Sequence, residues 1–246
     1  MKEFTVQKPD DGRRLDKWIK SHVPGLNNAL TQKFLRLKRI KRNGKSAHAD
    51  DRLEAGDVLN FYIEDEFFQP VLVNRIDRFT GGIVICAKNE ESMHILSDKI
   101  RTHEIEKAYL CLTEGKMNPE SGVLKGYIVK KQGKSRVTVQ KTASPGAQYA
   151  ETKYKVLAYD KGKALTECVL VTGRTHQIRA QFADSGHPLW GDTAYGAKPD
   201  AGRNYQALYS YKITFAFQTD AGILNYLSNK TMTVKNVPFA RGFERI

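Results

Sequence analysis

One acidic side chain in this sequence lies between two arginines, in a segment that suits catalysis. Asp77 has Arg75 and Arg78 beside it, and a glycine pair at 81–82 follows, just before an apolar run at 83–87. Nearby cations favour the charged form of a carboxyl group, so we expect Asp77 to be ionised. The glycines allow a sharp turn or a close backbone approach. An ionised carboxylate on such a loop can act as a nucleophile or a base, and a structural ion pair within a turn is the alternative interpretation.

Two stretches of the chain are rich in Lys and Arg and contain no acidic residue. Residues 31–45 carry seven basic side chains, and residues 123–141 carry six in an alternating pattern that predicts a basic hairpin with a turn at Gly133. Clustered cations can bind phosphates and release counterions, although a charged run can also be a solvated face. In the first stretch, we predict RNA contacts at Arg36, Lys38, Arg39, Lys41, Arg42 and Lys45.

The composition indicates an ordinary globular protein with a basic surface. The 246 residues include 40 Lys and Arg against 27 Asp and Glu, which gives a net charge of +13 and favours a polyanionic partner. No apolar run is long enough to span a bilayer and no signal peptide is visible, so we expect a cytoplasmic protein that does not bind membranes. The three cysteines have no metal-ligand spacing, which predicts buried, reduced thiols.

The elements that must position these residues follow from the apolar periodicity. In the first part of the chain we predict helices at 13–23 and 28–37, the second with Leu30, Phe34 and Leu37 facing inward, and a strand at 58–63. Further along, a buried strand at 83–87 precedes a helix capped by Asn89. We then expect strands at 107–113, 150–159, 165–172 and 206–217, and a helix at 178–185. Many strands and few helices in mixed order predict an α+β fold.

Three segments, in this order, resemble the signature motifs of the RluA family of RNA pseudouridine synthases. Residues 74–82 are close to the family pattern His-Arg-Leu-Asp-Arg-x-Thr-Ser-Gly, with Asn74 in place of His, Ile76 in place of Leu and Gly81 in place of Ser. Residues 106–109 match a lysine-x-tyrosine strand. The third motif is Gly-Arg-Thr-His-Gln-Ile-Arg at 173–179, followed by Gly-His-Pro and then Gly-Asp. The resemblance covers about residues 70 to 246 and implies a catalytic domain with a mixed, mainly antiparallel sheet flanked by helices.

The N-terminal part is similar to another known module. Its helices, its basic stretch ending in Asn-Gly-Lys and its Gly-Asp strand resemble the ribosomal S4-like RNA-binding domain. We therefore predict two domains: an S4-like domain at 1–66 and a pseudouridine synthase domain at 70–246. Family members with this architecture have a linker, a strand and a turn that are absent near 67–70. Either they are deleted, or a segment has been left out of the sequence; the second explanation is favoured because losing core strands would expose unpaired edges.

The resemblance implies a catalytic role for three residues. Asp77 matches the family's invariant aspartate, which acts at the sugar either as a nucleophile or as a base. Tyr109 matches the active-site tyrosine, whose ring can stack on the base and whose phenol can relay a proton. Arg179 matches the arginine that pairs with the aspartate. The alternative for Tyr109 is a half-buried strand residue without a role in the reaction.

Other residues of the motifs are assigned to binding or to structure. We predict that Arg78 and Arg174 contact RNA, although each can instead support the loop that carries it. His176 is structural in the family, so we expect a scaffold role here. Asn74 replaces a histidine that helps to hold RNA, and the replacement is expected to affect affinity or site choice more than turnover.

The predicted reaction is the isomerisation of uridine to pseudouridine, which needs no metal or cofactor. We expect the enzyme to act as a monomer on RNA, with large-subunit ribosomal RNA as the favoured substrate and transfer RNA as the alternative. A non-catalytic RNA-binding or ribosome-assembly factor is a rival, because the motif departs from the family at Asn74 and Gly81. A hydrolytic glycosidase would need a second carboxylate opposite Asp77, and the motifs offer none.

Overall fold

The computed structural model describes residues 1–130, 136–200 and 203–243, which form two compact units. The first unit comprises Met1–Asn74, Ile85–Asp98 and Ala221–Leu224, and the second comprises the other described residues. In the described ranges, no helix is both long enough and apolar enough to cross a membrane.

The first unit contains a four-stranded antiparallel sheet, and its N-terminal part includes helices α1 and α2. The strands have the order β1-β4-β2-β3. Along the chain the elements are β1 (Lys2–Thr5), η1 (Lys8–Asp10), α1 (Leu15–His22), α2 (Asn28–Arg36), β2 (Ile40–Arg42), β3 (Lys45–Ser46) and β4 (Val58–Phe61). Helix α1 buries Leu15, Trp18 and Ile19 in the core of this unit, as its periodicity predicts.

Helix α2 is present, and two of the three residues predicted to face inward, Leu30 and Phe34, pack against the core of this unit. They are partly buried, and Thr31 and Leu35 are buried. Leu37 is 53% exposed, because the helix ends at Arg36 and Leu37 is its C-cap. The predicted inward position of Leu37 is therefore wrong: the helical spacing no longer holds once the helix has ended.

The connection between the predicted domains is short and ordered. Residues Asp65–Phe68 form the 3-10 helix η2, and β5 (Val71–Leu72) then pairs with β7 (Cys86–Ala87). Phe67 and Phe68 pack against the core of the first unit, and the carbonyl of Phe67 accepts a hydrogen bond from the Gly25 N–H.

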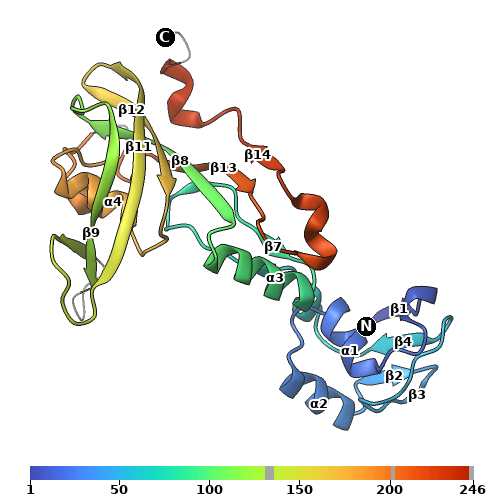
Figure 1. Ribbon diagram of the computed structural model, residues 1–246. Coiled ribbons are helices and arrows are strands. Elements are labelled where there is room, and N and C mark those ends of the chain that lie inside the picture. The colour runs from blue at the N-terminus through green and yellow to red at the C-terminus, as the bar shows by residue number, and fades with distance from the viewer. Residues whose placement is uncertain (131–135, 201–202, 244–246) are drawn as a thin grey trace. The chain divides into compact units, whose positions relative to one another are not determined.

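The second unit is built on an eight-stranded sheet, shown in Figure 1. Seven strands follow the order β10-β9-β11-β12-β8-β13-β14 with antiparallel pairing, and β6 joins β13 in parallel. The mixed, mainly antiparallel sheet confirms the predicted α+β class. The strands are β6 (Gly81–Gly82), β8 (Ile105–Glu114), β9 (Ser121–Lys130), β10 (Val137–Gln140), β11 (Gln148–Asp160), β12 (Lys163–Leu170), β13 (Leu208–Phe215) and β14 (Thr231–Thr233).

The second unit contains α4 (Gln177–Asp184) and the short 3-10 turns η3 (Thr193–Tyr195) and η5 (Pro238–Phe243). Helix α3 (Glu90–Arg101) and the 3-10 helix η4 (Gly222–Leu227) are divided between the units, because their residues up to Asp98 and Leu224 belong to the first unit and the rest to the second. Helix α4 packs on β9, β10 and β11, and Ile178 and Phe182 of this helix lie in a core that includes Tyr109. The predicted cap of α3 is confirmed, because the Asn89 side chain accepts a hydrogen bond from the Ser92 N–H at 2.8 Å.

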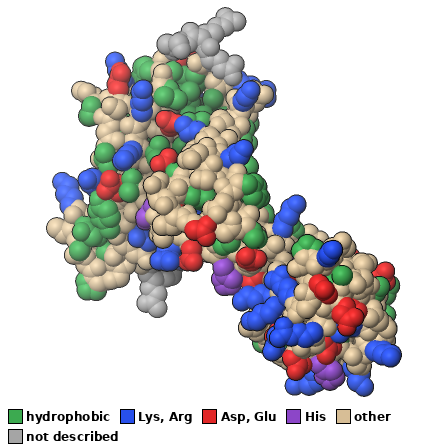
Figure 2. Space-filling view, turned by 45° about the vertical axis from the view of Figure 1, so that its right-hand side comes forward, with side chains coloured by type: hydrophobic (Ala, Val, Ile, Leu, Met, Phe, Trp, Pro, Cys, Tyr) green, Lys and Arg blue, Asp and Glu red, His purple; other side chains and the backbone are tan. Residues whose placement is uncertain are grey.

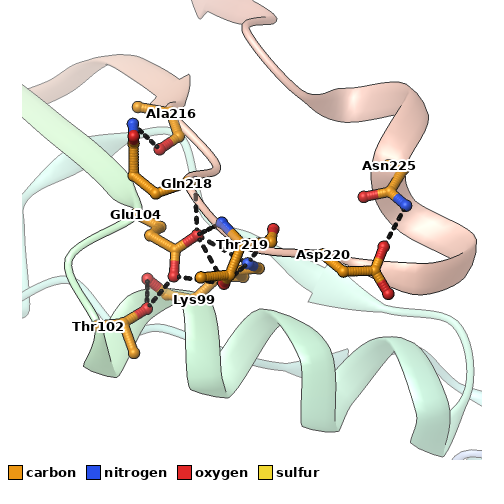
Figure 3. A network of polar contacts seen from close by, with 8 residues as sticks. All are labelled: Lys99, Thr102, Glu104, Ala216, Gln218, Thr219, Asp220 and Asn225. Carbon is orange, nitrogen blue, oxygen red and sulfur yellow. Dashed lines mark hydrogen bonds and ion pairs between the residues drawn. The ribbon is translucent and has the colours of Figure 1, made fainter.

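A buried ion pair joins the C-terminal end of α3 to the start of β8 and to the chain after β13 (Figure 3). The Lys99 ammonium lies 2.7 Å from a carboxylate oxygen of Glu104 and also donates to the carbonyl and hydroxyl of Thr219, each at 2.6 Å. The Glu104 carboxylate in turn accepts the backbone N–H groups of Gln218 and Thr219. The hydrogen bond from Lys99 holds the pKa of Glu104 well below its usual range.

Two predictions for the apolar segments are wrong. Residues 83–87 do not form one buried strand: only Cys86 and Ala87 are in a strand, and Val84 is 39% exposed. Cys86 is exposed, whereas Cys111 and Cys168 are buried and free as predicted. Exposed Val84 and Cys86 alternate with buried Ile85 and Ala87, so only one side of this segment faces the core.

The basic hairpin is confirmed in its strands. β9 and β10 pair antiparallel, with Val137 opposite Lys130. Its predicted turn at Gly133, with Lys131 and Lys134, lies outside the described residues.

Candidate active site

Asp77 lies on a loop that is anchored from both sides. The carbonyl of Asp77 accepts the Thr80 N–H at 2.9 Å, which closes a turn. The side-chain amide of Gln206 donates to the carbonyl of Arg78 at 2.7 Å and to the hydroxyl of Thr80 at 3.1 Å. The loop backbone is thus held in place while the Asp77 carboxylate, half-buried, has no hydrogen bond or ion pair within the described part of the chain.

The two glycines after the loop are required by close backbone contact. β6 lies so near β13 that a Cβ on Gly82 would meet the carbonyl oxygen of Ser210 at 2.1 Å, and Gly82 also has a φ of +110°. A Cβ on Gly81 would lie 2.6 Å from the ring of Tyr209. This confirms the predicted close approach. It also gives a physical reason why this chain has Gly81 where the family pattern has serine, since the serine side chain would clash with the Tyr209 ring.

Tyr109 enters the site from the middle of β8. Its side chain is only 6% exposed and packs in a core with Ile178 and Phe182 of α4. Burial raises the pKa of the phenol, and the negative charge of nearby Asp77 acts in the same direction. Tyr109 is therefore protonated at neutral pH.

Arg179 projects from α4 and is bound by a different carboxylate from the one that the resemblance implies. Its guanidinium donates to both carboxylate oxygens of Asp192, at 2.7 and 2.8 Å, and both side chains are buried. Burial opposes the charge of Arg179, but the hydrogen bonds and charge of Asp192 raise its pKa, and Asp77 adds to this effect. No hydrogen bond joins Arg179 to Asp77 among the described residues, so the two side chains interact only by longer-range electrostatic attraction.

His176 and Tyr195 support the arginine. His176 has a left-handed backbone (φ 52°) immediately before α4, and its Nδ1 lies 2.9 Å from the Tyr195 hydroxyl. That hydroxyl accepts the Val137 N–H, which leaves its own proton for His176. The Arg179 guanidinium lies 4.8 Å from the centre of the Tyr195 ring. Burial lowers the pKa of His176, which favours the neutral form of the ring.

The remaining predicted RNA-binding residues of the second unit, Arg78 and Arg174, differ in their contacts. Arg78 is exposed next to Asp77, with its guanidinium 4.9 Å from the ring centre of Phe79. Arg174 is also exposed, but its Nε donates to the carbonyl of Tyr149 at 3.0 Å. Asn74 accepts the Ile85 N–H at 2.7 Å and thereby holds the segment before the loop.

Most of the basic residues predicted in the first unit are exposed. Arg36, Lys38, Arg39 and Lys45 are open to solvent, and Lys41 is half-buried beside Tyr62. Arg42 differs, because its guanidinium lies 2.6 Å from the buried carboxylate of Asp57. Arg42 therefore supports the fold, which leaves the other five cations as candidates for phosphate contacts.

Three supporting residues did not emerge from sequence reasoning. Asp192 binds Arg179, Tyr195 braces His176, and Gln206 anchors the loop of Asp77. The Gly-Asp pair at 191–192 was the one available signal, since it follows the third motif at a short spacing. No sequence pattern pointed to Gln206 or Tyr195, because their contacts with the site form only in the folded chain.

Comparisons with known proteins point to one family. The family described as RNA pseudouridylate synthase matches residues 41–184. An uncharacterized RNA pseudouridine synthase of Mycoplasma pneumoniae is 32% identical over 181 residues, covering 73% of this chain and 59% of that protein. Ribosomal large subunit pseudouridine synthase C of Haemophilus ducreyi is 33% identical over 150 residues, covering 58% of this chain and 47% of its own length.

A solved structure supports the same fold. Human RNA pseudouridylate synthase domain containing 4 has a TM-score of 0.55 at 22% identity, covering 68% of this chain and 71% of that one. The chain belongs to the RNA pseudouridylate synthase family, whose members are RNA isomerases. It spans less than two thirds of the length of the curated relatives described above.

Proposed function

We propose that this protein is an RNA pseudouridine synthase with Asp77 as its central catalytic residue. The observation that carries the proposal is the placement of an unbonded carboxylate, on a braced loop, within electrostatic reach of buried Tyr109 and Arg179. A carboxylate without hydrogen bonds remains available to a substrate, whereas the neighbouring Asp192 is fully engaged by Arg179.

The reaction requires one bond to break and another to form. The bond between C1′ of the ribose and N1 of uracil is cleaved, the base turns, and C1′ joins C5. C5 then loses its proton and N1 gains one, so the product is an isomer of the substrate. The Asp77 carboxylate can attack C1′ and stabilise its positive charge, or it can assist proton removal at C2′. Both routes use the same carboxylate.

The neighbours of Asp77 define the other roles. Tyr109 is protonated because burial raises its pKa, so its ring supports the base and its phenol donates a hydrogen bond. Relay of the C5 proton then requires Tyr109 to pass its own proton on as it accepts another. Arg179, fixed by Asp192, provides an immobile positive charge within electrostatic reach of Asp77.

We further propose large-subunit ribosomal RNA as the substrate and transfer RNA as the second candidate. Relatives named ribosomal large subunit pseudouridine synthases C and D share about a third of their aligned residues with this chain. A target uridine in structured RNA must leave its stack to reach Asp77. The N-terminal residues, which we propose to be an S4-like domain, would add phosphate contacts through their exposed cations and so raise affinity.

Tritium release tests the proposal directly. Transcripts of ribosomal RNA and of transfer RNA carry uridine labelled with tritium at C5, and the protein is compared with its Asp77→Asn variant. We expect release from ribosomal transcripts by the wild type and none by the variant. Equal release by both proteins would reject the role of Asp77. Tight RNA binding without any release by the wild type would favour the non-catalytic RNA-binding alternative.

A further inference from the structure

The turn that carries Asp77 contains a bulky residue in a conformation that ordinarily belongs to glycine or asparagine. Phe79 has a φ of +67° and is the third residue of the turn closed by Thr80. A left-handed backbone is unfavourable for an aromatic residue. Phe79 is nevertheless 60% exposed, so its ring is not held there by burial in a core. Such strain beside a reactive carboxylate indicates a functional position.

A second exposed aromatic residue lies against Phe79. The ring of Tyr205 is stacked on that of Phe79, with centroids 5.5 Å apart and an angle of 28° between the planes, and Tyr205 is 40% exposed. The two rings come from segments more than a hundred residues apart in the sequence. Together they form an exposed aromatic surface, the Phe79–Tyr205 platform, whose first ring is two residues from Asp77.

The platform is flanked by two guanidinium groups. The Cζ of Arg78 lies 4.9 Å from the centre of the Phe79 ring, and the Cζ of Arg203 lies 4.6 Å from that of Tyr205. Arg203 is fixed, because it donates to the carbonyls of Tyr205 and Gln206 at 2.9 and 3.1 Å. In the described part of the chain, no acidic side chain pairs with either arginine. The patch therefore offers π faces and uncompensated positive charge together.

The platform is also rigidly connected to the catalytic loop. Gln206, adjacent to Tyr205, donates to the backbone of Arg78 and to the side chain of Thr80, the two residues on either side of Phe79. Two residues of extended chain span at most about 7 Å, so the Cα atoms of Phe79 and Asp77 lie within about 7 Å of each other. A surface fixed in this way loses little entropy on binding.

We propose that the Phe79–Tyr205 platform binds an unpaired nucleobase next to the target uridine, by stacking. The proposal rests on the proposed function, because it assumes an RNA substrate with its uridine at Asp77. Unstacked bases bind to aromatic rings and arginine planes, and the ring–cation arrangement fits a base with its phosphate better than it fits an apolar protein partner. When the uridine is flipped out, its neighbour loses a stacking partner and Phe79 replaces it.

The test measures binding in the Asp77→Asn background, where the RNA stays unmodified. The probes are hairpin RNAs whose loop contains one uridine, with the fluorescent base 2-aminopurine on its 5′ side in one probe and on its 3′ side in the other. We expect the protein to quench one of the two. Phe79→Gly, which suits the left-handed backbone, should abolish quenching and weaken binding by about 5- to 100-fold. The slope of affinity against salt should stay unchanged, because no phosphate contact is lost.

Two further variants make the result specific. Phe79→Trp keeps an aromatic ring and should restore quenching, which shows that the loss in Phe79→Gly is not a folding defect. Tyr226→Ala removes another exposed aromatic ring, 67% exposed on η4, and should bind like the parent. Quenching that persists in Phe79→Gly, or no quenching of either probe by the parent, would reject the proposal that the Phe79–Tyr205 platform stacks on a base. Failure of tritium release by the wild type would instead reject the proposed function, so the two failures are distinguishable.

Discussion

At the scale of single residues, the site divides two aspartates between different tasks. Asp192 accepts two hydrogen bonds from Arg179 and is 2% exposed, so it is an anchor. Asp77 is without such bonds among the described residues and lies on the loop fixed by Gln206. The difference follows from position: the Asp192 carboxylate is buried against Arg179 of α4, whereas the Asp77 carboxylate is half-buried on a loop.

Asp77→Asn should separate catalysis from binding. The amide has nearly the same size but can neither attack C1′ nor accept a proton, so turnover should be lost. RNA affinity should stay within about tenfold of wild type, because phosphate contacts supply most of the binding free energy. Filter binding at fixed salt provides the measurement. A loss of affinity as large as the loss of turnover would mean that Asp77 mainly shapes the binding surface.

Arg179→Lys should reduce turnover by roughly 10²- to 10³-fold, the usual effect of removing one preorganised electrostatic group. A lysine cannot replace the two parallel hydrogen bonds to Asp192, so the positive charge would no longer be fixed. Single-turnover kinetics with saturating enzyme measure this effect without a contribution from RNA affinity. Arg174→Lys is the matched control, since Arg174 is exposed at the other end of the same motif. Equal effects of both variants would contradict the special role of Arg179.

At the scale of elements, β8 and the chain after β13 are held by charge as well as by the sheet. The network of Lys99, Glu104 and Thr219 fastens the end of α3 beside β8, the strand that carries Tyr109 (Figure 3). A depressed carboxyl pKa means that the folded state favours the ionised form, and the unfolded state does so less. The network therefore stabilises the protein above the ordinary glutamate pKa of about 4.3, and that contribution is lost as pH falls toward the lower folded value.

Glu104→Gln should consequently lower stability in a pH-dependent way. We expect a lower urea midpoint than wild type at pH 7 and a difference that shrinks as the pH falls from about 4 to 2, because the carboxylate of the unfolded wild-type chain then takes up a proton, which favours unfolding, while that of the folded protein stays largely ionised. Glu106→Gln is the control, since Glu106 is exposed on the same strand. A difference of constant size from pH 7 to pH 2 would show that the side chain contributes by shape rather than by charge.

At the scale of the whole molecule, the net charge of +13 is carried almost entirely by the second unit, which has 25 Lys and Arg against 13 Asp and Glu, whereas the first unit has 15 against 14. The first unit is thus nearly neutral, but Figure 2 shows Lys and Arg side chains gathered on its visible face, with acidic side chains among them. Five of the six predicted RNA-binding cations of this unit are without a carboxylate partner within the described residues, whereas Arg42 is bound to Asp57. Free cations can release counterions from RNA, but a cation already paired with an acid contributes little.

Replacement of Lys38, Arg39 and Lys41 by Gln should flatten the dependence of RNA binding on salt. If all three contact phosphates, the slope of log affinity against log salt should fall by about two to three. Arg42 is left intact, because its removal would expose the buried Asp57 charge. A variant with Gln at Lys155, Lys161 and Lys230 has the same net charge and serves as control. Equal slopes for the two triple variants would mean that the first unit does not direct binding.

Much of the architecture was determined by local sequence. Apolar periodicity placed α1, and Asn89 placed the start of α3, because capping and amphipathic spacing act over a few residues. Alternation predicted the hairpin of β9 and β10 and the positions of most other strands in the sheet. The motif around Asp77 also fixed the need for glycines, since only a residue without a Cβ allows β6 to lie so close to Ser210. These features depend on neighbours in the chain or on one close contact.

The tertiary structure decided which groups meet. The pairing of Arg179 with Asp192, the exposure of Cys86 and Leu37, and the stacking of Phe79 on Tyr205 each depend on where distant segments come to lie. The bonding partner of a buried ion is the carboxylate that folding brings within hydrogen-bond distance, and sequence spacing does not reveal that distance. The sequence by itself therefore identified Asp77 and the family motifs. Only the folded chain distinguished Asp77, which has no bonded partner among the residues that the structure describes, from Asp192, which holds Arg179.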